Sequence, residues 1–417
     1  MQPQAHIDTM YSHISLESVS AACEEVFEYE FDFDHPGDAE LRGVVFMPFL
    51  AGESVHDLGD QNVRWAVDMG MLRRDEPGFM GLLKGGFEDL ATLVYRDDSW
   101  DDVALAANFM TMLFVFDDLV DSELSPIGSS YATAVTVTDY LMKAVYGEQP
   151  GELPEGTPYK AKLTGIANAL IDIHQRIMDR AAEVDPGWYY ASMRDYFDGV
   201  VSESRSRSNR AIHGVDDYAA VRLQFSAVLP CFELGLLMQG LELSDELRAS
   251  PSFRSMQRAA VLSVSYVNDL FSYRKEFLAG ERSNLVMVLE RTEQLGRGEA
   301  LAKACEIHTE VIREYKRAKR TLRFDAAYDE AAAYYVELME YWMRGNLDWT
   351  MDNRTQRYCE ASSTDIPVVS LNEYTTEFDA DWAPSDESSE SGEWDGFDFD
   401  GDELEFDDVP RRLAVVR

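Results

Sequence analysis

The stretch from Val103 to Val120 reads VALAANFMTMLFVFDDLV and is almost entirely apolar until it reaches its acidic end. A helix that is apolar on every side is buried inside a protein rather than laid on its surface. The stretch therefore predicts a core helix whose acidic C-terminal end opens into a cavity.

Other parts of the chain also have helical patterns, and none has a strand pattern. Proline is scarce, with 14 residues, which favours long helices. We find no Asn-Gly or Asp-Gly hairpin between alternating strands, no glycine-rich phosphate loop and no internal repeat. The sequence predicts an all-α fold, with further helices over residues 219–229, 231–243, 253–277 and 330–351 and a break near Pro230.

The charge balance excludes several classes of function. The 417 residues include 37 Lys and Arg against 77 Asp and Glu, a formal net charge of −40. Nucleic acids and anionic membranes both need clustered positive charge, so neither is an expected partner. The apolar run from Ala227 is interrupted by Pro230 and Glu233, and no membrane span is predicted. The N-terminus has no signal or transit pattern, and we expect a cytoplasmic protein.

The C-terminal part of the chain has a different composition from the rest. Residues 361–410 contain 17 acidic residues and no Lys or Arg. Self-repulsion and the lack of an apolar face predict disorder there. Such a tail is either a solvated extension, the simpler interpretation, or a partner-binding segment. We expect a folded body over residues 1–360, peripheral up to about position 40, and a tail over 361–417.

The acidic end of the first stretch is the first candidate site. Asp117, Asp118 and Asp121 form the pattern DDLVD. The helix dipole disfavours anions at a C-terminal end, and residues four apart point the same way. Carboxylates that converge on a cavity need a cation, and oxygen ligands suit Mg²⁺. The alternative is a solvated helix end.

The second candidate site is the stretch NDLFSYRKE, residues 268–276. Asn268, Ser272 and Glu276 follow at intervals of four and lie within roughly 80° of arc on one helix face. An amide oxygen, a hydroxyl and a carboxylate form an oxygen site, but one charge binds Mg²⁺ only if a phosphate completes the shell. The alternative is a polar face with a surface Glu–Lys pair.

Together these motifs resemble the two metal-binding motifs of class I terpene synthases. The second matches the family pattern (N/D)Dxx(S/T)xxxE without a gap. Arg222 precedes Asn268 by 46 residues, where microbial members carry a diphosphate-sensing arginine, and the stretch from Trp349 to Arg357-Tyr358 resembles their C-terminal W…RY element. The resemblance spans roughly Met47 to Tyr358. The sequence as a whole is similar to fungal, basidiomycete-type sesquiterpene synthases.

The resemblance implies a helical bundle around a central cavity, three Mg²⁺ ions and a prenyl diphosphate substrate, most readily farnesyl diphosphate. It implies that Asp117 bridges two ions, with Asp118 or Asp121 nearer the outer shell. It assigns the third ion to Asn268, Ser272 and Glu276, and the diphosphate oxygens to Arg222, Lys275, Arg357 and Tyr358. A monomer or a homodimer is expected.

A dry, aromatic cavity would protect a carbocation from water and stabilise it. The candidates for its wall are Phe87, Phe114, Tyr341 and Trp342, each equally well explained as core. Phe225 and Ser226 depart from the pattern, because Phe225 cannot connect Arg222 to the metal motif by charge. The alternatives are a monoterpene or acyclic alcohol synthase, a chain-elongating prenyltransferase, and a non-catalytic helical interaction protein.

Overall fold

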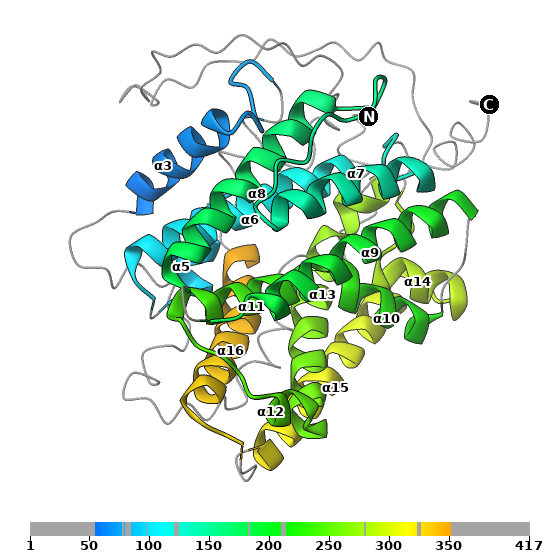
Figure 1. Ribbon diagram of the computed structural model, residues 1–417. Coiled ribbons are helices and arrows are strands. Elements are labelled where there is room, and N and C mark those ends of the chain that lie inside the picture. The colour runs from blue at the N-terminus through cyan, green and yellow to red at the C-terminus, as the bar shows by residue number, and fades with distance from the viewer. Residues whose placement is uncertain are drawn as a thin grey trace, which may run out of the picture.

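Helix α6, Trp100–Val120, is buried along most of its length, with 15 of its 21 residues buried. Its burial confirms the core helix that the sequence predicts. The computed structural model describes residues 55–76, 79, 85–96, 98–120, 125–181, 184–209, 214–278, 281–322 and 327–351. Every regular element in these ranges is a helix (Figure 1), so the all-α prediction is confirmed.

The helices are joined by connections of different lengths. Their bounds are α3 Val55–Asp68, α5 Phe87–Val94, α7 Tyr131–Val145, α8 Lys160–Arg180, α9 Gly187–Asn209, α10 Val215–Phe225, α11 Val228–Gln239, α12 Asp245–Ala249, α13 Pro251–Leu278, α14 Leu285–Thr292, α15 Arg297–Leu322 and α16 Glu330–Met351. Two residues separate α10 from α11, and fourteen separate α7 from α8. The predicted helices over 253–277 and 330–351 correspond to α13 and α16.

The predicted break near Pro230 is displaced. The chain leaves α10 after Phe225 and re-enters a helix at Val228, so the break falls on Ser226 and Ala227. Pro230 lies inside the first turn of α11, where proline is tolerated because its missing N–H has no intrahelical acceptor. Ala227 takes a left-handed conformation, with φ of 57°, which is unfavourable for a residue with a Cβ.

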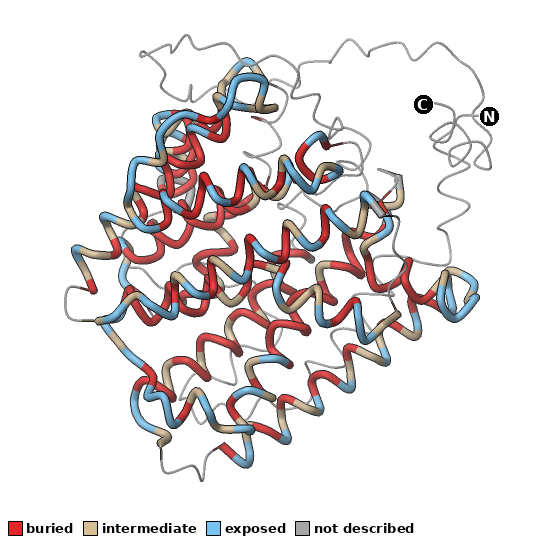
Figure 2. Tube along the Cα trace, turned by 45° about the vertical axis from the view of Figure 1, so that its right-hand side comes forward, coloured by how far each residue is buried: buried red, intermediate tan, exposed pale blue. Residues whose placement is uncertain are grey.

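The helices pack as a bundle with their apolar faces inward, as the buried inner faces in Figure 2 show. α13 packs most extensively on α15 and also contacts α16, α14 and α10. The end of α16 is fixed by Trp349, whose Nε1 donates to the carbonyl oxygens of Gly85 and Gly86 at 3.1 and 2.8 Å. Its ring lies 5.7 Å from that of Phe114, so α16, α5 and α6 meet at this point.

Among the residues that the structure describes, two segments are long and apolar enough to cross a membrane by length and composition alone, Trp100–Val120 and Val215–Gln239. Most of each segment is buried against other helices, and the second is interrupted at the α10–α11 break. Burial inside the bundle accounts for their apolar character.

Candidate active site

A cavity lies between α5, α6, α9, α10, α11, α13 and α16, and it holds about 970 Å³ of atom-free space when its open mouth is included. One part of its wall is apolar and aromatic, and the other part is polar. The lining residues are Leu90, Met110, Leu113, Phe114, Asp117, Tyr196, Arg222, Phe225, Ser226, Ala227, Val228, Cys231, Val264, Ser265, Asn268, Glu276, Ser283, Trp342 and Asn346.

The acidic end of α6 reaches this cavity through one of its carboxylates. Asp117 is half-buried and lines the wall, whereas Asp118 is exposed and is not among the lining residues. This difference follows from the helix period, because neighbouring residues point about 100° apart. Asp121 lies outside the described residues.

The second motif lies on α13, where Asn268 and Glu276 line the cavity and Ser272 lies between them. Ser272 is 1% exposed, and its Oγ has no hydrogen-bond partner among the described residues. A buried hydroxyl without a partner is rare in a folded protein and needs an explanation. The Glu276 carboxylate is fixed by a hydrogen bond, because Asn284 Nδ2 donates to its Oε2 at 2.9 Å.

These groups fit the metal that the sequence predicts. An amide oxygen, a hydroxyl and carboxylates are hard ligands of the kind that bind Mg²⁺, and a metal ion would satisfy Ser272 Oγ. Within the described residues, no group of three His, Cys, Asp or Glu side chains is placed to hold a metal ion.

Arg222, on α10, lies directly against the second motif. Its Nη2 donates to Asn268 Oδ1 at 3.1 Å and pairs with Asp269 Oδ1 at 2.9 Å. The sequence indicates that Phe225 cannot connect Arg222 to the metal motif by charge. In the structure Phe225 lines the cavity, and Arg222 contacts the motif directly.

Two residues that support Arg222 were missed by the sequence analysis. Asp269 is 1% exposed and also accepts a hydrogen bond from the Tyr218 hydroxyl, at 2.6 Å. Burial and the Asp269 carboxylate raise the pKa of Tyr218 well above its usual 10, so the hydroxyl keeps its proton. Tyr218 lies four residues before Arg222, a spacing that places both on one face of α10. This four-residue interval was the one feature of the sequence from which a contribution of Tyr218 could have been predicted.

The aromatic candidates have different positions. Phe114 and Trp342 line the cavity. Phe87 is buried and stacks on Phe114, with ring centroids 4.3 Å apart, so it forms a layer behind the wall. Tyr341 is not among the lining residues, and its ring faces the Arg96 guanidinium at 5.9 Å.

Three of the expected diphosphate donors cannot be placed with Arg222. Lys275 belongs to α13, but its side chain is not described. Arg357 and Tyr358 lie outside the described residues. The part of their motif that the structure does describe is Trp349, which anchors the end of α16 beside the cavity wall.

A second hollow lies on the outer side of α13, between α10 and α15. It contains none of the motif residues. Charged side chains in it pair with one another, such as Arg258 with Glu314 at 3.4 Å and Lys303 with Glu306 at 3.4 Å. The described motif residues that line a cavity, Asp117, Asn268 and Glu276, therefore line the first cavity and not this one.

Comparison with known proteins gives a consistent result. The family model described as terpene synthase family 2, C-terminal metal binding, matches residues 108–314. A (+)-T-muurolol synthase that cyclises (2E,6E)-farnesyl diphosphate in Streptomyces clavuligerus is 30% identical, covering 75% of this chain and 71% of its own. An enzyme of the same name from Roseiflexus castenholzii is 28% identical, covering 75% and 93%.

A solved structure shares the fold. The crystal structure of an α-eudesmol synthase superposes with a TM-score of 0.58 at 21% identity, covering 74% of this chain and 99% of that one. Helical architecture, the motifs on α6 and α13 and these relatives agree, and we conclude that the chain belongs to the class I terpene synthase family.

Proposed function

We propose that the enzyme ionises farnesyl diphosphate, releases inorganic diphosphate and converts the carbocation into a sesquiterpene hydrocarbon or alcohol. One observation carries the proposal: Asp117, Arg222, Asn268 and Glu276 line a single cavity whose remaining wall is largely apolar. A diphosphate needs the polar part, and a hydrocarbon chain needs the apolar part. The relatives that cyclise farnesyl diphosphate support the choice of a fifteen-carbon substrate.

In this proposal, Asp117, Asp118 and Asp121 of the first motif and Asn268, Ser272 and Glu276 of the second would hold Mg²⁺, with three ions expected. Bound Mg²⁺ supplies Lewis-acid stabilisation of the leaving diphosphate. Arg222, Lys275, Arg357 and Tyr358 donate hydrogen bonds to the diphosphate oxygens. Donors fixed in a water-poor site stabilise the developing charge without reorganising.

The apolar wall has a separate task. It excludes water, which would otherwise capture the carbocation before it cyclises. The faces of Phe114 and Trp342 stabilise a cation through their ring quadrupoles. Product identity then depends on the contour of this wall and on where the last cation loses a proton or meets water.

The test is a product analysis of the purified full chain with Mg²⁺ and prenyl diphosphates of ten, fifteen and twenty carbons. We expect diphosphate release and a fifteen-carbon terpene from farnesyl diphosphate. Turnover of the ten-carbon substrate alone would indicate a monoterpene synthase, and an acyclic alcohol would indicate capture by water without cyclisation. Chain elongation with isopentenyl diphosphate would indicate a prenyltransferase, and no diphosphate release with any substrate would overturn the proposal.

The proposal assigns catalysis to a body of residues 1–360, acting in the cytoplasm as a monomer or homodimer. It assigns no catalytic task to the acidic tail, residues 361–417, because the tail contributes no motif.

A further inference from the structure

A buried arginine joins the two sides of the candidate active site. Arg207, near the end of α9, has a side chain that is 6% exposed, and its Nη1 donates to the carbonyl oxygen of Val120 at 2.8 Å. Val120 is the last residue of α6, the helix that carries Asp117 and Asp118. The last carbonyls of a helix have no intrahelical donors, and the dipole there is negative. Arg207 therefore caps the acidic end of α6.

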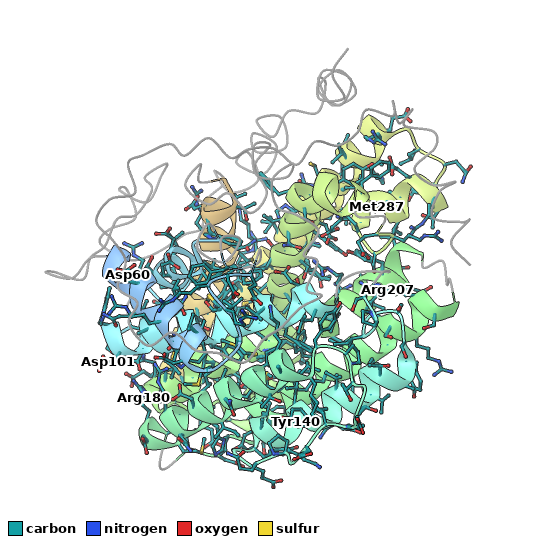
Figure 3. All side chains as sticks on the ribbon, turned by 90° about the horizontal axis from the view of Figure 1, so that it is seen from above. Asp60, Asp101, Tyr140, Arg180, Arg207 and Met287 are labelled. Atoms are coloured by element: carbon teal, nitrogen blue, oxygen red, sulfur yellow. The ribbon has the colours of Figure 1, made fainter. Side chains whose placement is uncertain are left out.

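The same guanidinium also contacts the segment that follows α13. Arg207 Nη2 lies 3.6 Å from Glu281 Oε2, and the Glu281 side chain is 3% exposed. The Glu281 backbone N–H donates to the carbonyl oxygen of Glu276 at 2.9 Å, which ties this segment to the second metal motif. In Figure 3, Arg207 on α9 and Met287 on α14 lie on the same side of the molecule.

A third contact holds the arginine in place. Arg207 Nε lies 3.6 Å from Oε1 of Glu203, one turn earlier on α9, and that carboxylate is also 3% exposed. Buried charges are retained only when they are paired. The planar guanidinium presents five donors in a fixed arrangement, whereas a lysine ammonium is a point charge on a flexible stem. Three nitrogens of one guanidinium thus face three separate partners, one at hydrogen-bond distance and two at ion-pair distance, an arrangement that a point charge on a flexible stem does not reproduce.

We propose that Arg207 is a positioning residue that sets the separation between the aspartate end of α6 and the Asn268–Glu276 motif of α13. The inference rests on the proposed function, because its purpose is to make both motifs face one Mg²⁺–diphosphate group. Arg207 acts through the two helix ends and does not itself line the cavity. Outer-shell groups of this kind typically change metal affinity roughly ten- to hundredfold when they are replaced.

The test compares Arg207→Met and Arg207→Lys with Arg194→Met in the full-length protein. Arg194 lies on the same helix, is 40% exposed and contacts Asp139 only at 3.7 Å, so its replacement is a matched control. The melting temperature is followed as MgCl₂ is titrated at fixed inorganic diphosphate. We expect the Mg²⁺ midpoint to rise roughly ten- to hundredfold in Arg207→Met, to rise less in Arg207→Lys, and to stay at the wild-type value in Arg194→Met.

A purely structural role gives a different result. It lowers the melting temperature of Arg207→Met without moving the Mg²⁺ midpoint, and that outcome overturns the proposal. If Arg207→Met does not fold, Glu281→Gln removes the charge of one contact and keeps its shape, and a wild-type midpoint in this variant and in Arg207→Lys overturns the proposal equally. If the wild-type protein itself shows no response to Mg²⁺ and diphosphate, the proposed function fails instead.

Discussion

Arg222 Nη2 lies 3.1 Å from Asn268 Oδ1, so the candidate diphosphate donor rests on the first residue of the second metal motif. Asp269, next in sequence, pairs with the same nitrogen through Oδ1 at 2.9 Å. Its Oδ2 accepts a hydrogen bond from the Tyr218 hydroxyl. The connection between donor and motif is therefore direct and needs no acidic residue at Phe225. Any substitution at one of these positions changes the surroundings of the others, because they share one buried network.

The metal motifs are expected to be needed for turnover and not for folding. Asp117→Ala and Asn268→Ala should each abolish product formation from farnesyl diphosphate while circular dichroism remains that of the wild type. Asn268→Ala removes one acceptor of Arg222, which keeps its pair with Asp269, and the apolar core is untouched in both variants, so the bundle stays folded. Collapse of either spectrum would show a structural role, and turnover near wild type would show that the metal assignment is wrong.

The hydroxyl of Tyr218 is expected to contribute to stability through Asp269. Tyr218→Phe removes a 2.6 Å hydrogen bond to a buried carboxylate, which keeps a backbone donor, Leu285 N, at 3.2 Å. We expect a loss of about 1–2 kcal/mol in the free energy of unfolding, measured in urea. Tyr140→Phe is the matched control, because Tyr140 is also buried and its hydroxyl makes no hydrogen bond to another described residue. Equal losses in the two variants would contradict the assigned contribution.

Stability is expected to depend on His308 at acidic pH. Its Nε2 lies 3.0 Å from Ser263 Oγ, and burial lowers its pKa from 6.5 to about 4. The unfolded chain then binds a proton below about pH 6.5, which the folded chain does not bind until about pH 4. Stability from this group is complete above pH 6.5 and falls as the pH falls toward 4, by about 3 kcal/mol in total.

Urea unfolding of the wild type and of His308→Gln at pH 7, 5.5 and 4.5 measures this effect. The difference between the two proteins should shrink as the pH falls, because glutamine does not titrate. A difference that is constant across this range would show that His308 does not titrate differently in the folded and unfolded chains. Acidic groups common to both proteins cancel in the comparison.

The acidic tail is expected to be dispensable for the chemistry. A chain that ends at Glu360 removes the 17 acidic residues of 361–410 and keeps every candidate site residue. Its product profile from farnesyl diphosphate should match that of the full chain. A changed product, or a folded truncation without turnover, would mean that the tail takes part in closing the site.

The fold class could be predicted from the sequence, and so could the placement of the candidate metal motifs on α6 and α13. Both depend on local periodicity: the apolar run of α6 requires burial, and intervals of four residues place Asn268, Ser272 and Glu276 on one face of α13 whatever surrounds it. The bounds of α16 followed from the same pattern. The break after α10 did not, because proline in the first turn of α11 does not interrupt a helix.

Which side chains meet could not be predicted from the sequence. Periodicity gives the direction of a residue on its own helix and not the helix that covers it, so Phe114 lines the cavity while Phe87 lies behind it and Tyr341 faces Arg96. The contacts of Arg207 with Val120 and Glu281 join residues that lie 87 and 74 positions away along the chain. Such contacts are set by the packing of whole helices, and no local pattern in the sequence records them.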